Sequence, residues 1–156
     1  MYWSLRLGVF IALFSACALP CYAKDRGPQG VDAAWVKAMK ANDVNAVVQC
    51  YASDAVAWLP GVPSAKGEQA IRSAYAGLLS ANTVKDAVLS DAVYKSAGKM
   101  TVSWGRFSLT LMPKAGGNPV VLTGRYTEVI EKRNGKWVYT VDHASAEPTG
   151  MQGAKQ

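Results

Sequence analysis

The spacing of apolar residues changes once along this chain, near Val84, and no other feature constrains the fold as strongly. Before this point apolar side chains recur at the spacing of a helix surface, most clearly at Val31, Ala34, Trp35, Ala38 and Met39. After it they alternate with polar residues, which predicts four strands, at residues 86–95, 99–112, 119–132 and 136–146. Helices followed by strands indicate an α+β domain, and the short turns between the strands predict antiparallel neighbours.

Shorter elements complete the predicted first half. Asp43 can cap a second helix with the apolar set Val44, Val47, Val48 and Tyr51, followed by a turn at Ser53-Asp54. Residues 55–59 read as a short strand ended by Pro60 and Pro63, and residues 71–79 as a third helix. In the strand at 99–112 the apolar residues change parity around Gly105. We therefore predict a bulge there, which would bend the sheet and give it a concave side for the helices.

The two ends of the chain do not look like parts of the domain. Residues 1–23 have the apolar stretch and the Cys21-Tyr22-Ala23 cleavage pattern of a secretory signal peptide, which predicts a periplasmic or secreted protein. Alternatively, Phe14-Ser15-Ala16-Cys17 loosely resembles a lipobox, and Cys17 would then carry a lipid anchor. Residues 24–30 form a polar lead-in and residues 148–156 a loose polar tail, so the domain is expected at 31–147.

Composition excludes several classes of site. After cleavage Cys50 has no cysteine partner, so no internal disulfide is expected and Cys50 is interpreted as a buried apolar residue. The net charge of +6 is scattered apart from a cluster at the Asn134-Gly135 turn, which argues against nucleic-acid binding. One histidine and scattered carboxylates do not form a zinc set, and no glycine-rich phosphate loop precedes a helix. We therefore expect no metal, no cofactor and, after residue 23, no membrane span.

Several short segments carry a family resemblance. They are Trp35, the run YASDAV at 51–56, Gly67-x-x-x-Ile71, and a C-terminal series from RYTEV at 125–129 through RNGKW at 133–137 to HAS at 143–145. Together they resemble the nuclear transport factor 2-like superfamily, with its ketosteroid isomerases and SnoaL-like polyketide cyclases, over residues 31–147. Within it, the chain is most similar to the calcium/calmodulin-dependent protein kinase II association domain and its bacterial relatives.

The resemblance implies a cone of curved sheet and three helices around a pocket, commonly in a dimer or larger ring, but no single activity. One departure matters. The ketosteroid isomerases that the chain resembles place a proton-shuttling aspartate before a Pro-x-Gly-type turn, and Leu59 stands in that place, ahead of Pro60-Gly61. Because leucine cannot carry a proton, we do not expect ketosteroid isomerase chemistry in its usual form.

His143 is the single histidine of the chain and the natural acid/base candidate near neutral pH. A two-residue Asn134-Gly135 turn would place it opposite Tyr126, with Glu128 on the same face, where the imidazole could transfer protons. A three-residue turn would place it opposite Arg125, with Thr127, Tyr139 and Ser145, as two donors to a carbonyl or carboxylate. The resemblance favours the second register. In both, His143 points inward and Asp142 outward, although a lone histidine on an apolar face is often structural.

Two functions are compatible with this pattern. In the first, Trp58, Tyr75 and Trp104 line a pocket for a small organic ligand, with or without acid/base turnover by His143. In the second, the domain is a non-catalytic association module, a homodimer or larger homo-oligomer, paired through the outer face of its sheet. In the preferred register that outer face comprises Tyr126, Glu128, Ile130, Val138 and Thr140.

Overall fold

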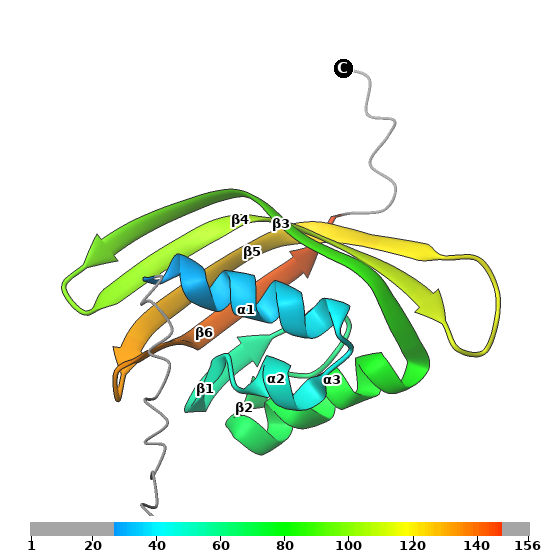
Figure 1. Ribbon diagram of the computed structural model, residues 1–156, viewed down its shortest axis with the longest axis horizontal. Coiled ribbons are helices and arrows are strands. Elements are labelled where there is room, and N and C mark those ends of the chain that lie inside the picture. The colour runs from blue at the N-terminus through cyan, green and yellow to red at the C-terminus, as the bar shows by residue number, and fades with distance from the viewer. Residues whose placement is uncertain (1–26, 148–156) are drawn as a thin grey trace, which may run out of the picture.

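The computed structural model describes residues 27–147, which form three helices and one six-stranded sheet (Figure 1). The signal peptide at 1–23, Cys17, the first part of the lead-in and the tail at 148–156 lie outside the described residues. Within the described part, no helix is long and apolar enough to span a bilayer. The predicted α+β class with N-terminal helices is confirmed.

The helices form where apolar spacing and capping residues predict them. Helix α1 (Gln29–Lys40) begins two residues before Val31 and buries Val31, Ala38 and Met39. Helix α2 (Val44–Val48) is capped by Asp43, whose side chain accepts a hydrogen bond from the Ala46 amide at 3.0 Å. Helix α3 (Glu68–Ala81) follows Gly67, whose φ of 81° favours glycine, and buries Ile71, Tyr75 and Leu79.

The strands are β1 (Tyr51–Trp58), β2 (Ala65–Lys66), β3 (Asn82–Ala97), β4 (Met100–Pro113), β5 (Val120–Arg133) and β6 (Lys136–Ala146). Their order in the sheet is β2-β1-β6-β5-β4-β3, and the four long strands pair antiparallel as predicted. Strand β1 includes Tyr51 and Ser53-Asp54, which were predicted as helix and turn. It runs parallel to β6, so the sheet is mixed.

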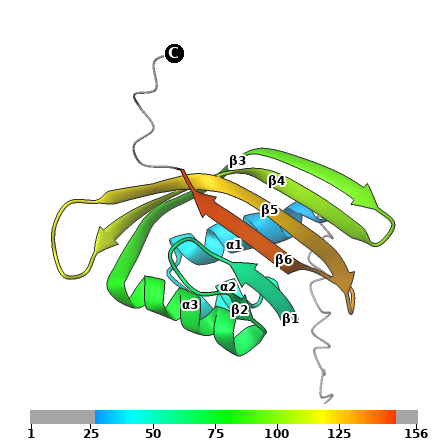
Figure 2. The same ribbon diagram turned by 180° about the vertical axis from the view of Figure 1, so that it is seen from behind.

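The sheet curves around the helices (Figures 1 and 2). Helices α1 and α3 lie on its concave side, the β3–β4 hairpin extends beyond them at one end, and the β4–β5 hairpin extends beyond them at the other. The buried core lies between these layers and includes Met39 and Ile71 from the helices and Ile130 and Tyr139 from the sheet. The long strands therefore form one wall of an interior closed on the other side by helices.

The bulge predicted in the strand at 99–112 is not in that strand: the register shift lies in β3, between Ser90 and Val93, opposite Gly105. Strand β4 pairs with β5 residue by residue from Met100 to Leu111, and its buried inner face keeps a single parity. The inner face of β4 begins with the polar residues Thr101 and Ser103, while the apolar Trp104 lies on the outer face. The apolar residues therefore change parity near Gly105, although the strand does not reverse its faces. Gly105 instead makes room for a neighbour, because an added Cβ would lie 2.9 Å from the Tyr126 hydroxyl and 2.6 Å from the Ser90 carbonyl oxygen.

Neither predicted register of the β5–β6 hairpin holds along its whole length. The two-residue turn pairs Arg133 with Lys136, and that register continues to Ile130 and Tyr139. The register then shifts by one residue at Thr140, so that Glu128 pairs with Asp142 and Thr127 with His143. An extra residue of this kind reverses the faces of every residue after it. Asp142 is consequently buried and His143 exposed.

Candidate functional site

The residues predicted around His143 do come together, but on the outer face of the sheet. His143 lies opposite Thr127, and Arg125 lies opposite Ser145. His143, Thr127 and Arg125 are all exposed. The expectation that this set points inward is wrong: Arg125 and Thr127 lie on the outer face of β5, and the bulge at Thr140 brings His143 to the same face.

The aromatic residues predicted to line the pocket lie on opposite faces of the sheet. Trp58 and Trp104 are 46% and 38% exposed on the outer face, and the Trp58 ring meets His143 edge-on with 6.2 Å between ring centroids. Tyr139 is buried in the interior, where its hydroxyl donates to Asp32 Oδ1 at 2.9 Å. Tyr75 does line the interior cavity. The outer face expected to form an interface is also corrected, since its five residues are all buried: Tyr126, Glu128, Ile130, Val138 and Thr140.

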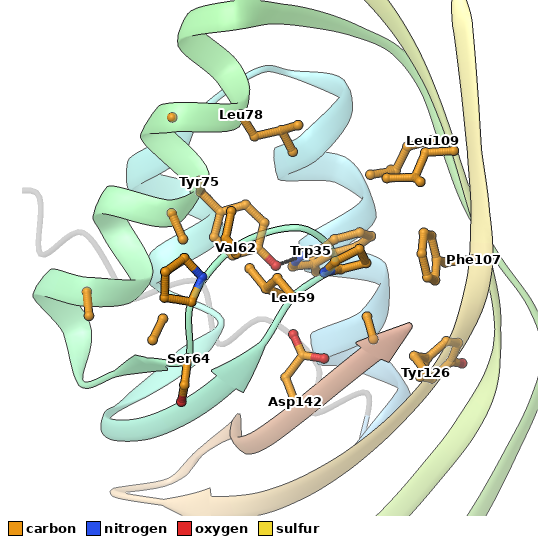
Figure 3. Close-up of a pocket in the computed structure, with 18 of the residues that line it drawn as sticks. Trp35, Leu59, Val62, Ser64, Tyr75, Leu78, Phe107, Leu109, Tyr126 and Asp142 are labelled. Atoms are coloured by element: carbon orange, nitrogen blue, oxygen red, sulfur yellow. Dashed lines mark hydrogen bonds between the residues drawn. The ribbon is translucent and has the colours of Figure 1, made fainter. Parts of the chain in front are cut away.

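A cavity of about 650 Å³ lies between the concave face of the sheet, α3 and the segment that follows β1 (Figure 3). This volume suits a small organic molecule. Most of the lining is apolar, with Leu59 and Val62 from the segment after β1, Leu78 from α3, and Phe107 and Leu109 from β4. Trp35 of α1 lies between Tyr75 and Phe107 in the close-up.

Two carboxyl groups interrupt the apolar lining. Glu128 of β5 and Asp142 of β6 are directly paired across the strands and are 5% and 6% exposed. Both line the cavity, and among the described residues the lining contains no lysine, arginine or histidine. Side chains paired in this way have Cβ atoms about 5 Å apart, so two negative charges here would repel each other strongly.

A chain of hydrogen bonds orients the Asp142 carboxyl. The Trp35 indole N–H can only donate, and it donates to the Tyr75 hydroxyl at 3.0 Å. The Tyr75 and Tyr51 hydroxyls are 2.6 Å apart, and Tyr51 donates to Asp142 Oδ2 at 2.6 Å. The Tyr75 proton therefore goes to Tyr51, and Oδ2 of Asp142 is an acceptor. Oδ1 receives no hydrogen bond from the described residues, and Figure 3 shows the carboxyl directed toward Leu59 and Trp35.

Burial gives the two carboxyls different pKa values. It raises the pKa of Asp142 to about 6, although the Tyr51 hydrogen bond and the positive charge available at His143 act in the opposite direction. Burial, together with the charges of Asp142 and Asp32, raises the pKa of Glu128 to about 9, against a hydrogen bond from Ser103 Oγ at 2.7 Å. Near neutral pH, Asp142 is therefore ionised and Glu128 protonated. This is a base beside an acid.

Two further buried groups lie around this pair. Asp32 of α1 accepts hydrogen bonds from Tyr94 and Tyr139, and burial raises the pKa of its carboxyl. The Tyr126 ring lines the cavity, while its hydroxyl is buried without a hydrogen-bond partner in the described structure. The surroundings of Glu128 and Asp142 are thus acidic or neutral.

Other possible sites are not formed in residues 27–147. No group of three potential metal ligands is present there. Cys50 is buried as predicted, and burial raises the pKa of its thiol to about 12, so it is not a reactive thiolate near neutral pH.

Sequence reasoning missed the central pair. The sequence pattern places Asp142 on the outer face, places Glu128 beside His143 in one register and on the outer face in the other, and gives Trp35 only as part of the apolar face of a helix. The usable signal was the presence of charged residues inside otherwise apolar strands, as in VDH at 141–143.

Comparison with known proteins agrees with this fold. A Xanthomonas campestris protein named for the calcium/calmodulin-dependent protein kinase II association domain has 26% identity and a TM-score of 0.71, over 84% of this chain and 93% of that one. A ketosteroid isomerase-like protein from Erwinia carotovora atroseptica has 19% identity and a TM-score of 0.68, over 78% and 94%. A Novosphingobium aromaticivorans protein named for scytalone dehydratase has 10% identity and a TM-score of 0.69, over 77% and 81%.

The last two likenesses are to the fold alone. A search of curated proteins gives no match. The family model of the SnoaL-like domain matches residues 33–140, from within α1 to within β6. With this match and the curved sheet around an interior cavity, the chain belongs to the SnoaL-like domain family.

Proposed function

We propose that the protein binds a small, mostly apolar molecule in the cavity and moves protons on it with Asp142 as base and Glu128 as acid. The observation that carries this proposal is the pairing of two buried carboxyls in an apolar cavity whose described lining offers no cation. Their surroundings give them different protonation states near neutral pH, which is the arrangement that acid/base catalysis requires.

The matching reaction class is isomerisation, or loss of water, next to a carbonyl group. Asp142 Oδ1 takes a proton from the carbon beside the carbonyl, and the electron pair left behind forms the new double bond. Glu128 gives its proton to the departing hydroxyl, which leaves as water. Because the two carboxyls are cross-strand neighbours, the proton gained by Asp142 can return to Glu128 and restore the pair. Similar folds carry isomerase and dehydratase names, which agrees with this class.

A β-hydroxyketone tests the proposal. We expect the protein to accelerate dehydration of 4-hydroxy-4-phenylbutan-2-one to the conjugated enone, followed by ultraviolet absorbance. Asp142→Asn should abolish the acceleration and Glu128→Gln should reduce it, whereas Thr123→Ala, at an exposed position on the outer face, should leave it unchanged. No acceleration of dehydration, and none of deuterium exchange beside the carbonyl, would contradict the proposal. Equal rates in Asp142→Asn and the unmodified protein would do the same.

A second function, self-association, is favoured by the outer face. One row of paired residues crosses five strands there: Trp58, His143, Thr127, Trp104 and Val93. Exposed aromatic rings on the outer face of a sheet are typical of interfaces. We propose that this row pairs two copies. Trp104→Lys should then convert a dimer to a monomer in light scattering, and an unchanged mass would refute the pairing.

We also propose that residues 1–23 direct export, on the strength of their apolar stretch and cleavage pattern. The N-terminal sequence of protein recovered from the periplasm tests this. A start after Ala23 is expected, a lipidated start at Cys17 would indicate anchoring, and an intact N-terminus would argue against cleavage.

A further inference from the structure

Among residues 27–147, no buried positive group faces the negative charge of Asp142. Five titratable groups face it or adjoin it: Tyr51 on β1, Tyr75 on α3, Glu128 on β5, Asp32 on α1 and His143 on β6. The first four are acids. His143 can be cationic, but it is exposed on the opposite face of the sheet. A buried charge without a partner is costly, so the cavity favours a ligand that brings the missing cation.

The carboxyl oxygens are available for such a ligand. Tyr51 uses Oδ2 of Asp142, and Ser103 uses Oε2 of Glu128. Oδ1 and Oε1 accept no hydrogen bond from the described residues, and both side chains line the cavity. The ionised Asp142 offers an acceptor oxygen, and the protonated Glu128 carboxyl beside it can still accept at the oxygen that carries no proton, so the pair suits a donor with several N–H groups; an ammonium has three.

The walls beside these oxygens are aromatic. Trp35, Tyr75, Phe107 and Tyr126 line the cavity, and the Asp142 carboxyl points toward Trp35 in Figure 3. The face of an aromatic ring attracts a cation, most strongly for tryptophan. The remaining walls are aliphatic and suit a hydrocarbon body.

We propose that the cavity is a binding site for apolar primary amines, with the ammonium held at Asp142 Oδ1 beside the Glu128 carboxyl and the hydrocarbon against the aromatic walls. This inference uses the carboxyl pair of the proposed function but needs no catalysis. An amine bound in this way would exclude a ketone substrate. A carboxylate-bearing ligand would be rejected, because it adds a second negative charge beside Asp142.

Three probes with one carbon skeleton test the charge preference by calorimetry at pH 7: 4-phenylbutylamine, 4-phenylbutan-1-ol and 4-phenylbutanoate. We expect the amine to bind at least about tenfold more tightly than the alcohol, as for a charge-assisted hydrogen bond replacing a neutral one, and the carboxylate not to bind. Asp142→Asn should remove the preference for the amine while the alcohol still binds. Thr123→Ala, at an exposed position outside the cavity, should keep it.

The pH supplies a second measurement that needs no variant. At pH 5 only about a tenth of the Asp142 carboxyl is ionised, while the amine stays protonated, so the amine should bind about tenfold more weakly than at pH 7. The affinity of the alcohol should not fall. An amine that binds no better than the alcohol at pH 7 would overturn the proposal, as would a preference that is as large at pH 5 or in Asp142→Asn as in the unmodified protein at pH 7, or no binding of any probe.

The two proposals fail separately. Amine preference without dehydration of the hydroxyketone would overturn the proposed reaction and leave the amine site. Dehydration that saturating amine does not inhibit would place the amine outside the cavity and overturn the amine site alone.

Discussion

Replacing Glu128 by glutamine should stabilise the fold, and by an amount that grows with pH. Burial raises the pKa of Glu128 from 4.5 to about 9, so the folded chain holds a proton that the unfolded chain has released over this range. A group of this kind has no effect below pH 4.5, where both states are protonated, and weakens folding progressively as the pH rises toward 9. Glutamine has no proton to take up.

The magnitude follows from this pH range. Each pH unit over which the folded chain alone holds the proton weakens folding by about 1.4 kcal/mol. Between pH 4.5 and 7 the penalty reaches about 3 kcal/mol, and at pH 9 about 6 kcal/mol. The glutamine amide oxygen can still accept the Ser103 hydroxyl that now bonds Glu128. The variant should therefore gain nearly the whole penalty.

Urea unfolding of the unmodified protein and Glu128→Gln at pH 4, 7 and 9 measures the difference directly. We expect free energies of unfolding that are equal at pH 4 and differ by about 3 and 6 kcal/mol at the two higher values. Glu68→Gln is the matched control, because the Glu68 side chain is exposed on α3 and its removal should change stability by less than about 1 kcal/mol at every pH. A difference that does not vary with pH, or a destabilised Glu128→Gln, would refute the reasoning.

Two further predictions follow from single contacts. Tyr51→Phe removes the hydrogen bond to Asp142 Oδ2, so the pKa of Asp142 should rise, and the acid limb of any Asp142-dependent rate should move to higher pH. The pKa is measured by ¹³C NMR titration of the Asp142 carboxyl. An unchanged pKa would show that this hydrogen bond does not tune the base. Gly124→Ala would place a Cβ 2.1 Å from the Ser145 carbonyl oxygen and 2.5 Å from Phe107 Cε1, and it should lower the free energy of unfolding by about 3 kcal/mol or more, measured by thermal melting. Gly77→Ala is its control, because the added Cβ meets nothing within 4 Å on α3, and it should be neutral or stabilising by up to about 1 kcal/mol.

The elements predictable from sequence are those fixed by local signals. Helical spacing, the Asp43 cap and the Asn134-Gly135 turn predicted α1, α2 and the β5–β6 hairpin. Strand β1 was predicted only in part, because its start resembles the end of a helix and its parallel pairing with β6 joins residues far apart in the chain. Such pairing leaves no local signal.

The face assignments were less predictable, for two physical reasons. A single extra residue at Thr140 reverses the later part of β6, and no turn chemistry marks it. The inner face is also unusually polar, with Ser103, Glu128 and Asp142, whereas the outer face carries Trp104. A rule that places apolar residues inside therefore assigns these strands the wrong way round.

The central claim is that Glu128 and Asp142 are a neighbouring acid and base in the cavity. It is tested most directly by a ¹³C NMR titration of side-chain carboxyls in the unmodified protein, with Asp142→Asn and Glu128→Gln used to assign the signals. The account predicts that Asp142 titrates near pH 6 and Glu128 near pH 9. A pKa of about 4 for both Asp142 and Glu128, as for solvent-exposed carboxyls in model peptides, would contradict it.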